Sequence, residues 1–364
     1  MEPAPSRPCR PRLHRKGRGA VSNRSGRYEP TTCESVDDGW GGLDEELPRL
    51  DTTVTIDATR TIITRNDSPD VSFDRSINPY RGCEHGCVYC FARPTHAFLG
   101  LSPGQDFETR LFAKPDAPRL LAEELRKPGY VCRVIALGTN TDPYQPIERR
   151  RCITRGVLGV LAAFRHPVGI VTKSALVTRD RDILAPMAAQ RLVRVYLSLT
   201  TLDRDLARRL EPRAPTPARR LAAIAALTGA GIPVGVLVAP VIPALNDSEI
   251  ERILEAAADA GATSAGYVLL RLPLEVRDLF REWLAVHSPL KAERVMKLLR
   301  EARGGRDYDA AWNRRMTGTG VYAGMIARRF DLARRRLGLA GRDWALDTTR
   351  FRPPPRRGDQ LSLL

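Results

Sequence analysis

The sequence lacks the features that mark membrane-embedded, exported or disulfide-stapled proteins. None of its apolar runs approaches the length that a membrane-spanning helix needs. The Arg- and Pro-rich residues 1–27 contain no apolar signal-peptide core, so export is not expected. The cysteines are odd in number and irregularly spaced, which is not typical of a disulfide framework; they are Cys9, Cys33, Cys83, Cys87, Cys90, Cys132 and Cys152. We therefore expect a reducing, cytoplasmic location and no membrane partner.

Lysine is scarce beside arginine, and the 364 residues carry a formal net charge of +16. Residues 1–30 hold eight Lys or Arg against two acids, and residues 301–364 hold fourteen Arg against seven acids. Basic ends suit a polyanionic partner, because each phosphate that is neutralised releases counterions. This distribution favours nucleic acid as the partner. A GC-rich genome also produces an Arg-rich, Lys-poor composition, and that alternative stays open.

A fourth cysteine is missing beside the three that stand closest together. Cys83, Cys87 and Cys90 follow a C-x3-C-x2-C spacing, whereas structural zinc and iron–sulfur sites normally use four ligands. Three thiolates on one loop can hold three corners of a [4Fe–4S] cube and leave the fourth iron open to a reacting molecule. Tyr89 can cover one side of such a cluster. The alternative is a zinc site, for which His85 and His96 are near but not at a familiar spacing.

This cysteine motif resembles that of the radical S-adenosylmethionine (SAM) superfamily. The resemblance implies that Cys83, Cys87 and Cys90 ligate a [4Fe–4S] cluster whose open iron binds SAM. One electron, from a donor such as flavodoxin or ferredoxin, then breaks the sulfonium bond, and the resulting 5′-deoxyadenosyl radical abstracts hydrogen from a substrate. The cofactor carries this chemistry, and the protein positions and shields it.

Alternating apolar strands and amphipathic helices predict an α/β fold with a parallel sheet. After an extended segment at 72–78, we expect strands at 131–137, 168–172, 192–199, 233–241 and 264–270. We expect helices at 117–126, 147–164, 181–190, 216–230 and 248–260, the last with Asn246 or Asp247 as N-cap. Six βα units match the partial (β/α)6 barrel of radical SAM proteins. Thr52–Thr64 fits a small hairpin or edge strand.

The predicted organisation has four parts. Residues 1–50 form a flexible, irregular region that is first basic and then acidic, and residues 51–275 form the partial barrel. Residues 276–340 form a helical extension, and residues 341–364 form a Pro/Arg-rich tail. The tail ends in Gln360, Leu361, Ser362, Leu363 and Leu364. This peptide resembles the one by which bacterial repair and replication proteins bind the sliding clamp, with Leu364 as a departure.

Reactive groups gather at the carboxyl ends of parallel barrel strands. The residues there, above all Asp142-Pro143-Tyr144-Gln145-Pro146, resemble the spore photoproduct lyase branch, or DNA repair photolyases, over residues 70–275. The resemblance implies SAM contacts for Thr139 and Asn140 (methionine moiety), Lys173 and Ser174 (carboxylate or ribose), Ser198 (ribose), and Val241 and Ile242 (adenine). The alternatives are that Asn140 and Asp142 cap turns and that Ser198 is an ordinary strand residue.

Two departures argue against spore photoproduct lyase activity itself. Thr139 stands where that branch has a hydrogen-donating cysteine, and Phe91 stands where it has a tyrosine. Cys132 lies at the opposite end of the same predicted strand, and Cys152 is expected to pack on a helix. A related hydrogen abstraction, from DNA in repair or modification, is the favoured function. The alternatives are radical modification of RNA or protein, and a non-catalytic iron–sulfur or zinc binding module.

Overall fold

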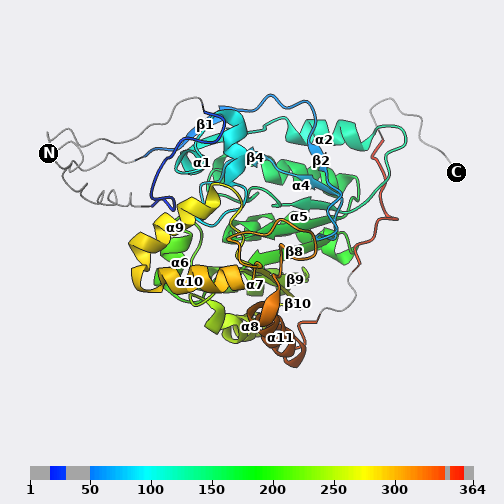
Figure 1. Ribbon diagram of the computed structural model, residues 1–364. Coiled ribbons are helices and arrows are strands. Elements are labelled where there is room, and N and C mark those ends of the chain that lie inside the picture. The colour runs from blue at the N-terminus through cyan, green and yellow to red at the C-terminus, as the bar shows by residue number, and fades with distance from the viewer. Residues whose placement is uncertain (1–16, 30–49, 341–344, 356–364) are drawn as a thin grey trace, which may run out of the picture.

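The computed structural model describes residues 17–29, 50–340 and 345–355. Its main element is a seven-stranded sheet in the order β10-β9-β8-β7-β6-β3-β2, flanked by helices (Figure 1). All neighbours from β10 to β3 pair in parallel, and β2 is antiparallel to β3. The strands are β2 (Ile63–Arg65), β3 (Arg75–Ile77), β6 (Ile135–Leu137), β7 (Val168–Thr172), β8 (Val193–Ser198), β9 (Val234–Val241) and β10 (Ser264–Leu269).

The parallel strands confirm the predicted α/β fold and its open barrel. The sheet runs from β10 to β2 without closing on itself among the described residues. Helices between the strands bury one apolar stripe each; in α8, Ile250, Ile253, Leu254 and Ala257 recur at helical spacing and are buried. The helices of the sheet layer are α2 (Ala117–Leu125), α3 (Glu148–Arg151), α4 (Ile153–Ala163), α5 (Arg181–Ala189), α6 (Arg204–Leu210), α7 (Pro217–Thr228) and α8 (Ile250–Asp259), with 3₁₀ turns η2 (Ala175–Asp180) and η3 (Asp247–Glu249).

The Thr52–Thr64 segment is divided between two sheets, so the predicted hairpin is wrong and the alternative, an edge strand, is right. β1 (Thr53–Ile56) pairs in parallel with β5 (Arg110–Ala113), whereas β2 joins the edge of the main sheet. β5 also pairs with β4 (Tyr80–Arg81), which makes a small sheet in the order β1-β5-β4. This small sheet holds the chain on both sides of the cysteine loop.

Two other local predictions are corrected. The helix expected at 147–164 is broken at Cys152, whose backbone has φ 51° between α3 and α4, and the Cys152 side chain is exposed rather than packed. The Asn246 side chain does not cap a helix. It is buried and binds the backbone of Ile242, Thr200 and Pro240 instead.

The C-terminal extension is helical, as predicted, apart from a helix-free stretch at 302–319. Its helices are α9 (Val276–His287), α10 (Pro289–Glu301) and α11 (Gly320–Arg336). Trp283 and Phe280 of α9 pack in one apolar cluster with Cys87 and Val88 of the cysteine loop. α11 instead packs on α8 and β10 (Figure 1). The extension therefore supports the loop as well as the far edge of the sheet.

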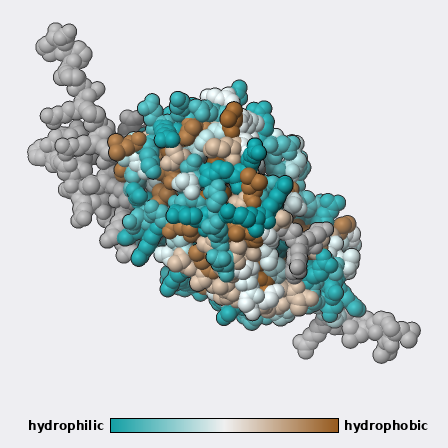
Figure 2. All heavy atoms as spheres, turned by 90° about the horizontal axis from the view of Figure 1, so that it is seen from below, coloured by the Kyte–Doolittle hydropathy of each residue, from teal (hydrophilic) through white to brown (hydrophobic). Residues whose placement is uncertain are grey.

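Residues 17–29 contain no helix or strand, yet they are packed on the body of the protein. The predicted region 1–50 therefore includes a segment that is not flexible. No helix among the described residues is long and apolar enough to span a membrane, and the face shown in Figure 2 mixes hydrophilic side chains with scattered apolar spots. The predicted clamp-binding peptide, 360–364, lies outside the described residues and stays a prediction.

Candidate functional site

The cysteine loop lies at the carboxyl end of the parallel strands, just after β3 and β4. Three backbone bonds fix it: Cys83 N–H donates to Phe107 (2.9 Å), Val88 N–H to Leu210 (3.1 Å) and Arg213 N–H to His85 (3.3 Å). Cys83 and Cys87 are buried, Cys90 is half-buried, and all three are free thiols. Burial raises the pKa of each thiol above its ordinary value.

The Asp142–Pro146 stretch holds the cysteine loop to the sheet. Gln145 accepts from the Glu84 N–H (2.9 Å) and donates to the Gly82 carbonyl (3.1 Å). Asp142 accepts from the N–H of Lys173 (2.8 Å), and its Oδ2 lies 3.3 Å from His85 Nδ1. Burial opposes ionisation of Asp142, but His85 and these hydrogen bonds outweigh it and lower its pKa to about 2. The motif therefore acts as a brace between the loop and the end of β7.

Lys173 and Ser198 meet at the same edge of the sheet. Lys173 Nζ donates to Ser198 Oγ (2.8 Å), and both reach the Ala239 carbonyl of β9. The Lys173 ammonium also lies 5.6 Å from the centre of the Tyr89 ring. A cation, a hydroxyl and an aromatic ring therefore converge beside the loop.

The sequence gave no indication of the buried carboxylate beneath this group. Glu211 accepts from Thr200 Oγ1 (2.6 Å), Tyr89 Oη and Arg220, and lies 3.7 Å from Lys173 Nζ. Burial would raise the pKa of Glu211, but the Arg220 and Lys173 cations outweigh it and lower the pKa to about 2. We name Tyr89, Lys173, Ser198, Thr200 and Glu211 the lysine chamber.

The other predicted SAM contacts lie at strand ends but do not all face this chamber. Thr139 and Asn140 are partly exposed, and the Asn140 N–H donates to Asn78. Ser174 is not free: its hydroxyl caps η2 by accepting from the Leu176 N–H (3.2 Å). Val241 and Ile242 are fully buried at the end of β9.

A segment far away in sequence completes the walls of the loop. Residues 17–29, which we name the N-terminal strap, run beside α1 (Asp106–Thr109) and α9 (Figure 1). The strap N–H groups of Gly19 and Ala20 each donate to the buried Glu108 carboxylate at 2.9 Å. Glu108 also pairs with Arg93 of η1 (Arg93–Leu99) at 2.5 Å, and neither side chain is exposed.

The residues between β3 and α8 match a family model. Residues 77–257 fit the model of the radical SAM superfamily. An uncharacterized protein of Mycobacterium tuberculosis is 43% identical over 230 residues, which is 63% of this chain and 68% of the relative. The chain belongs to the radical SAM superfamily. An uncharacterized protein of Methanocaldococcus jannaschii is 29% identical over 173 residues, 48% of this chain and 62% of that protein.

A solved structure shares the fold of this radical SAM protein. The Y98F mutant of spore photoproduct lyase superposes with a TM-score of 0.55 at 17% identity, over 79% of this chain and 80% of the other. Another structure of that enzyme is described with bound AdoMet and dinucleoside spore photoproduct, at a TM-score of 0.52 and 18% identity over 78% and 77% of the two chains. The cofactors of this radical SAM protein are a [4Fe–4S] cluster and SAM, as its sequence predicted.

The residues of the loop fit such a cluster. Backbone N–H groups of Asp142 and Ala92 are directed at the sulfurs of Cys83 and Cys90, and N–H bonds to sulfur are among the means by which proteins tune iron–sulfur clusters. No group of three His, Cys, Asp or Glu side chains in the described part of the chain is arranged, as it stands, around a single metal ion. The donors that the loop offers are three thiols without a fourth, which suits a cube with one open corner.

Replacing Gly19 by alanine should displace the strap of this radical SAM protein. A Cβ at this position would lie 1.7 Å from the Gly86 carbonyl oxygen of the cysteine loop, so backbone must move. We expect a loss of about 1–3 kcal/mol in the free energy of unfolding and a lower iron content after reconstitution. Urea unfolding and iron analysis measure the two effects.

Gly159→Ala in α4 is the control, because nothing lies within 4 Å of its added Cβ and alanine is the better helix former. If Gly19→Ala and Gly159→Ala unfold at the same urea concentration and bind the same iron, the strap does not hold the loop.

Proposed function

We propose that this radical SAM protein cleaves SAM reductively and abstracts hydrogen from a nucleic acid, with Cys83, Cys87 and Cys90 as ligands of its [4Fe–4S] cluster. The carrying observation is the lysine chamber, which sets Lys173 and Ser198 beside a loop of three free thiols. When bound, the cluster supplies the electron that breaks the sulfonium bond of SAM.

The chain's own side chains do the binding and orientation. The Lys173 ammonium is a charge partner for the SAM carboxylate, and the Ser198 hydroxyl can accept from a ribose hydroxyl. Glu211 and Thr200 hold Lys173 and Tyr89 in place from below. Thr139 and Asn140 on the neighbouring strand end remain candidates for the methionine moiety, and Val241 and Ile242 for the adenine. Ser174 is the weakest candidate, because its hydroxyl already caps η2.

Three observations support a nucleic acid as substrate. The net charge is +16, the fold is shared with an enzyme whose structures contain a dinucleoside lesion, and hydrogen abstraction suits DNA repair or modification. Phe91, which is 43% exposed, and Thr139 are not hydrogen donors. For that reason we propose a lyase or hydrogen-abstraction reaction other than that of spore photoproduct lyase.

The first test is production of 5′-deoxyadenosine. The protein is reconstituted anaerobically with iron and sulfide and then given dithionite and SAM. We expect product from the wild type and from Cys152→Ala, whose exposed thiol lies outside the loop, and none from Cys87→Ala. Absence of product from the wild type, with or without DNA, would move the function to a non-catalytic iron–sulfur or zinc binding module.

The second test identifies the class of substrate. Ultraviolet-irradiated DNA with deuterated sugars and thymines, deuterated RNA and deuterated protein are supplied separately. Deuterium in 5′-deoxyadenosine with DNA alone supports the proposal. Transfer from RNA or protein instead would replace it by the alternative, radical modification of that polymer.

A further inference from the structure

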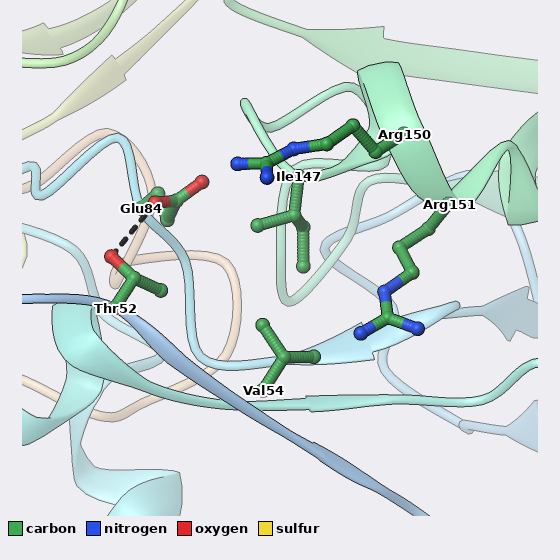
Figure 3. Close-up of a pocket in the computed structure, with 6 residues that line it drawn as sticks. All are labelled: Thr52, Val54, Glu84, Ile147, Arg150 and Arg151. Carbon is green, nitrogen blue, oxygen red and sulfur yellow. Dashed lines mark hydrogen bonds between the residues drawn. The ribbon is translucent and has the colours of Figure 1, made fainter.

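Five arginines surround the outer side of the cysteine loop. We name Arg149, Arg150, Arg151, Arg213 and Arg219 the arginine face. A groove of about 430 Å³ is lined by Glu84, Arg150 and Arg151, with Arg150 extending toward Glu84 (Figure 3). A second hollow of about 130 Å³ is lined by His85 together with Arg149, Arg213 and Arg219. Glu84 and His85 are the residues directly after Cys83 in the loop.

The charges of this face are not neutralised by the protein. Within the described residues, no acid pairs with Arg149, Arg150, Arg151 or Arg219, all of which are exposed. Arg213 is the exception, since it lies 3.1 Å from Glu84. Neighbouring arginines behave differently: Arg155 pairs with Asp180 and Asp182, and Arg179 pairs with Glu148 and Asp180. An unpaired cluster beside such pairs indicates an acidic partner from outside the chain.

The position of the face distinguishes between two kinds of acidic partner. Glu84 and His85 are buried and lie between Cys83 and Cys87, so the face adjoins the thiol-bearing loop itself. The lysine chamber adjoins a later part of the loop, at Tyr89. Ser174 lines the second hollow, but its hydroxyl caps η2 and does not connect the two sites. A polymer substrate has to reach the lysine chamber, whereas an electron donor has only to reach the loop.

We propose that the arginine face docks an acidic one-electron carrier protein of the flavodoxin or ferredoxin class, an inference that rests on the proposed function. In this encounter the reduced carrier is oxidised by one electron, which passes into the site held by the cysteine loop, and no proton or leaving group is transferred. Opposite charges steer such partners together and raise the rate of association. Redox encounters bury little surface, so a compact charged face is sufficient.

The test removes three charges of the face in the full-length protein. The variant Arg149→Gln/Arg150→Gln/Arg151→Gln is compared with Arg294→Gln/Lys297→Gln/Arg328→Gln, which removes three exposed charges from α10 and α11. Binding of oxidised flavodoxin is measured by fluorescence anisotropy at low salt, which requires no catalysis. We expect the face variant to bind about tenfold more weakly and with less salt dependence, and the control variant to bind as the wild type does.

A kinetic arm uses reduced flavodoxin or dithionite to drive 5′-deoxyadenosine formation. We expect the face variant to lose about tenfold of the flavodoxin-driven rate and to keep the dithionite-driven rate. Equal flavodoxin binding by both variants would overturn the proposal. Loss of oligonucleotide affinity by the face variant, with flavodoxin binding unchanged, would assign the face to nucleic acid. If dithionite yields no product in the wild type, the proposed function fails, while the binding arm still decides the docking.

Discussion

Glu108→Ala should lower the free energy of unfolding by about 3–5 kcal/mol, because it leaves a fully buried guanidinium without its carboxylate. Arg93 is 0% exposed, and Glu108 is its ion-pair partner. The same substitution removes the acceptor of the Gly19 and Ala20 N–H groups, so the strap loses its anchor. Urea unfolding of the apoprotein at pH 7 measures the loss, and reconstitution should yield less iron.

Glu123→Ala is the matched control, since Glu123 is 57% exposed and pairs with Arg119 on the surface of α2. An exposed pair of this kind contributes about 1 kcal/mol or less. A Glu108→Ala protein that unfolds within about 1 kcal/mol of the control would mean that Arg93 finds other partners. Arg93 also donates to the carbonyls of Cys87, Pro103 and Gly104, which are the contacts that could supply such compensation.

The strands of the barrel could be predicted from the sequence because each buries an apolar pattern of its own. The Val168–Thr172 strand is confirmed at both ends, and β8, β9 and β10 lie within one residue of their predicted bounds. The strand predicted at 131–137 was too long, since only Ile135–Leu137 is paired. Short polar-flanked strands carry a weaker pattern, so their starting points are less well defined.

Helix α6 was missed, although its first turn carried a signal. Asp203 caps it by accepting from the N–H groups of Asp205 and Leu206. Its seven residues hold three arginines and an aspartate, so little apolar periodicity was available. The break at Cys152 also had no signal in the sequence, because cysteine seldom adopts positive φ and the surrounding pattern is continuous.

The cysteine loop could be predicted as a candidate site because its spacing lies within one short segment. Its supports could not, because they are tertiary contacts between distant residues. Glu108 meets the strap 88 and 89 residues away, and Glu211 meets Tyr89 122 residues away. Composition treats Glu and Arg as surface residues, so a buried pair such as Arg220–Glu211 has no signature in one sequence.

Glu211→Gln is expected to destabilise the protein by about 3–5 kcal/mol, because Arg220 is 1% exposed and loses its only carboxylate among the described residues. Glu211 is ionised in the folded state down to a pKa of about 2, below its ordinary value. Its contribution is therefore fully present above the ordinary pKa of a glutamate and is lost as the pH falls toward 2. Urea unfolding from pH 7 down to acid measures both effects.

The wild type and Glu211→Gln should therefore converge in stability as the pH falls. Glu255→Gln is the control, because Glu255 is 46% exposed and pairs with Arg336 on the surface; it should change the stability by less than about 1 kcal/mol. Adding Arg220→Met to Glu211→Gln removes both members of the buried pair and should recover much of the loss. A double variant no more stable than Glu211→Gln would show that Arg220 is not the source of the penalty. In that case the hydrogen bonds from Thr200 and Tyr89 would carry it, and the lysine chamber would depend on Glu211 as an acceptor rather than as a charge.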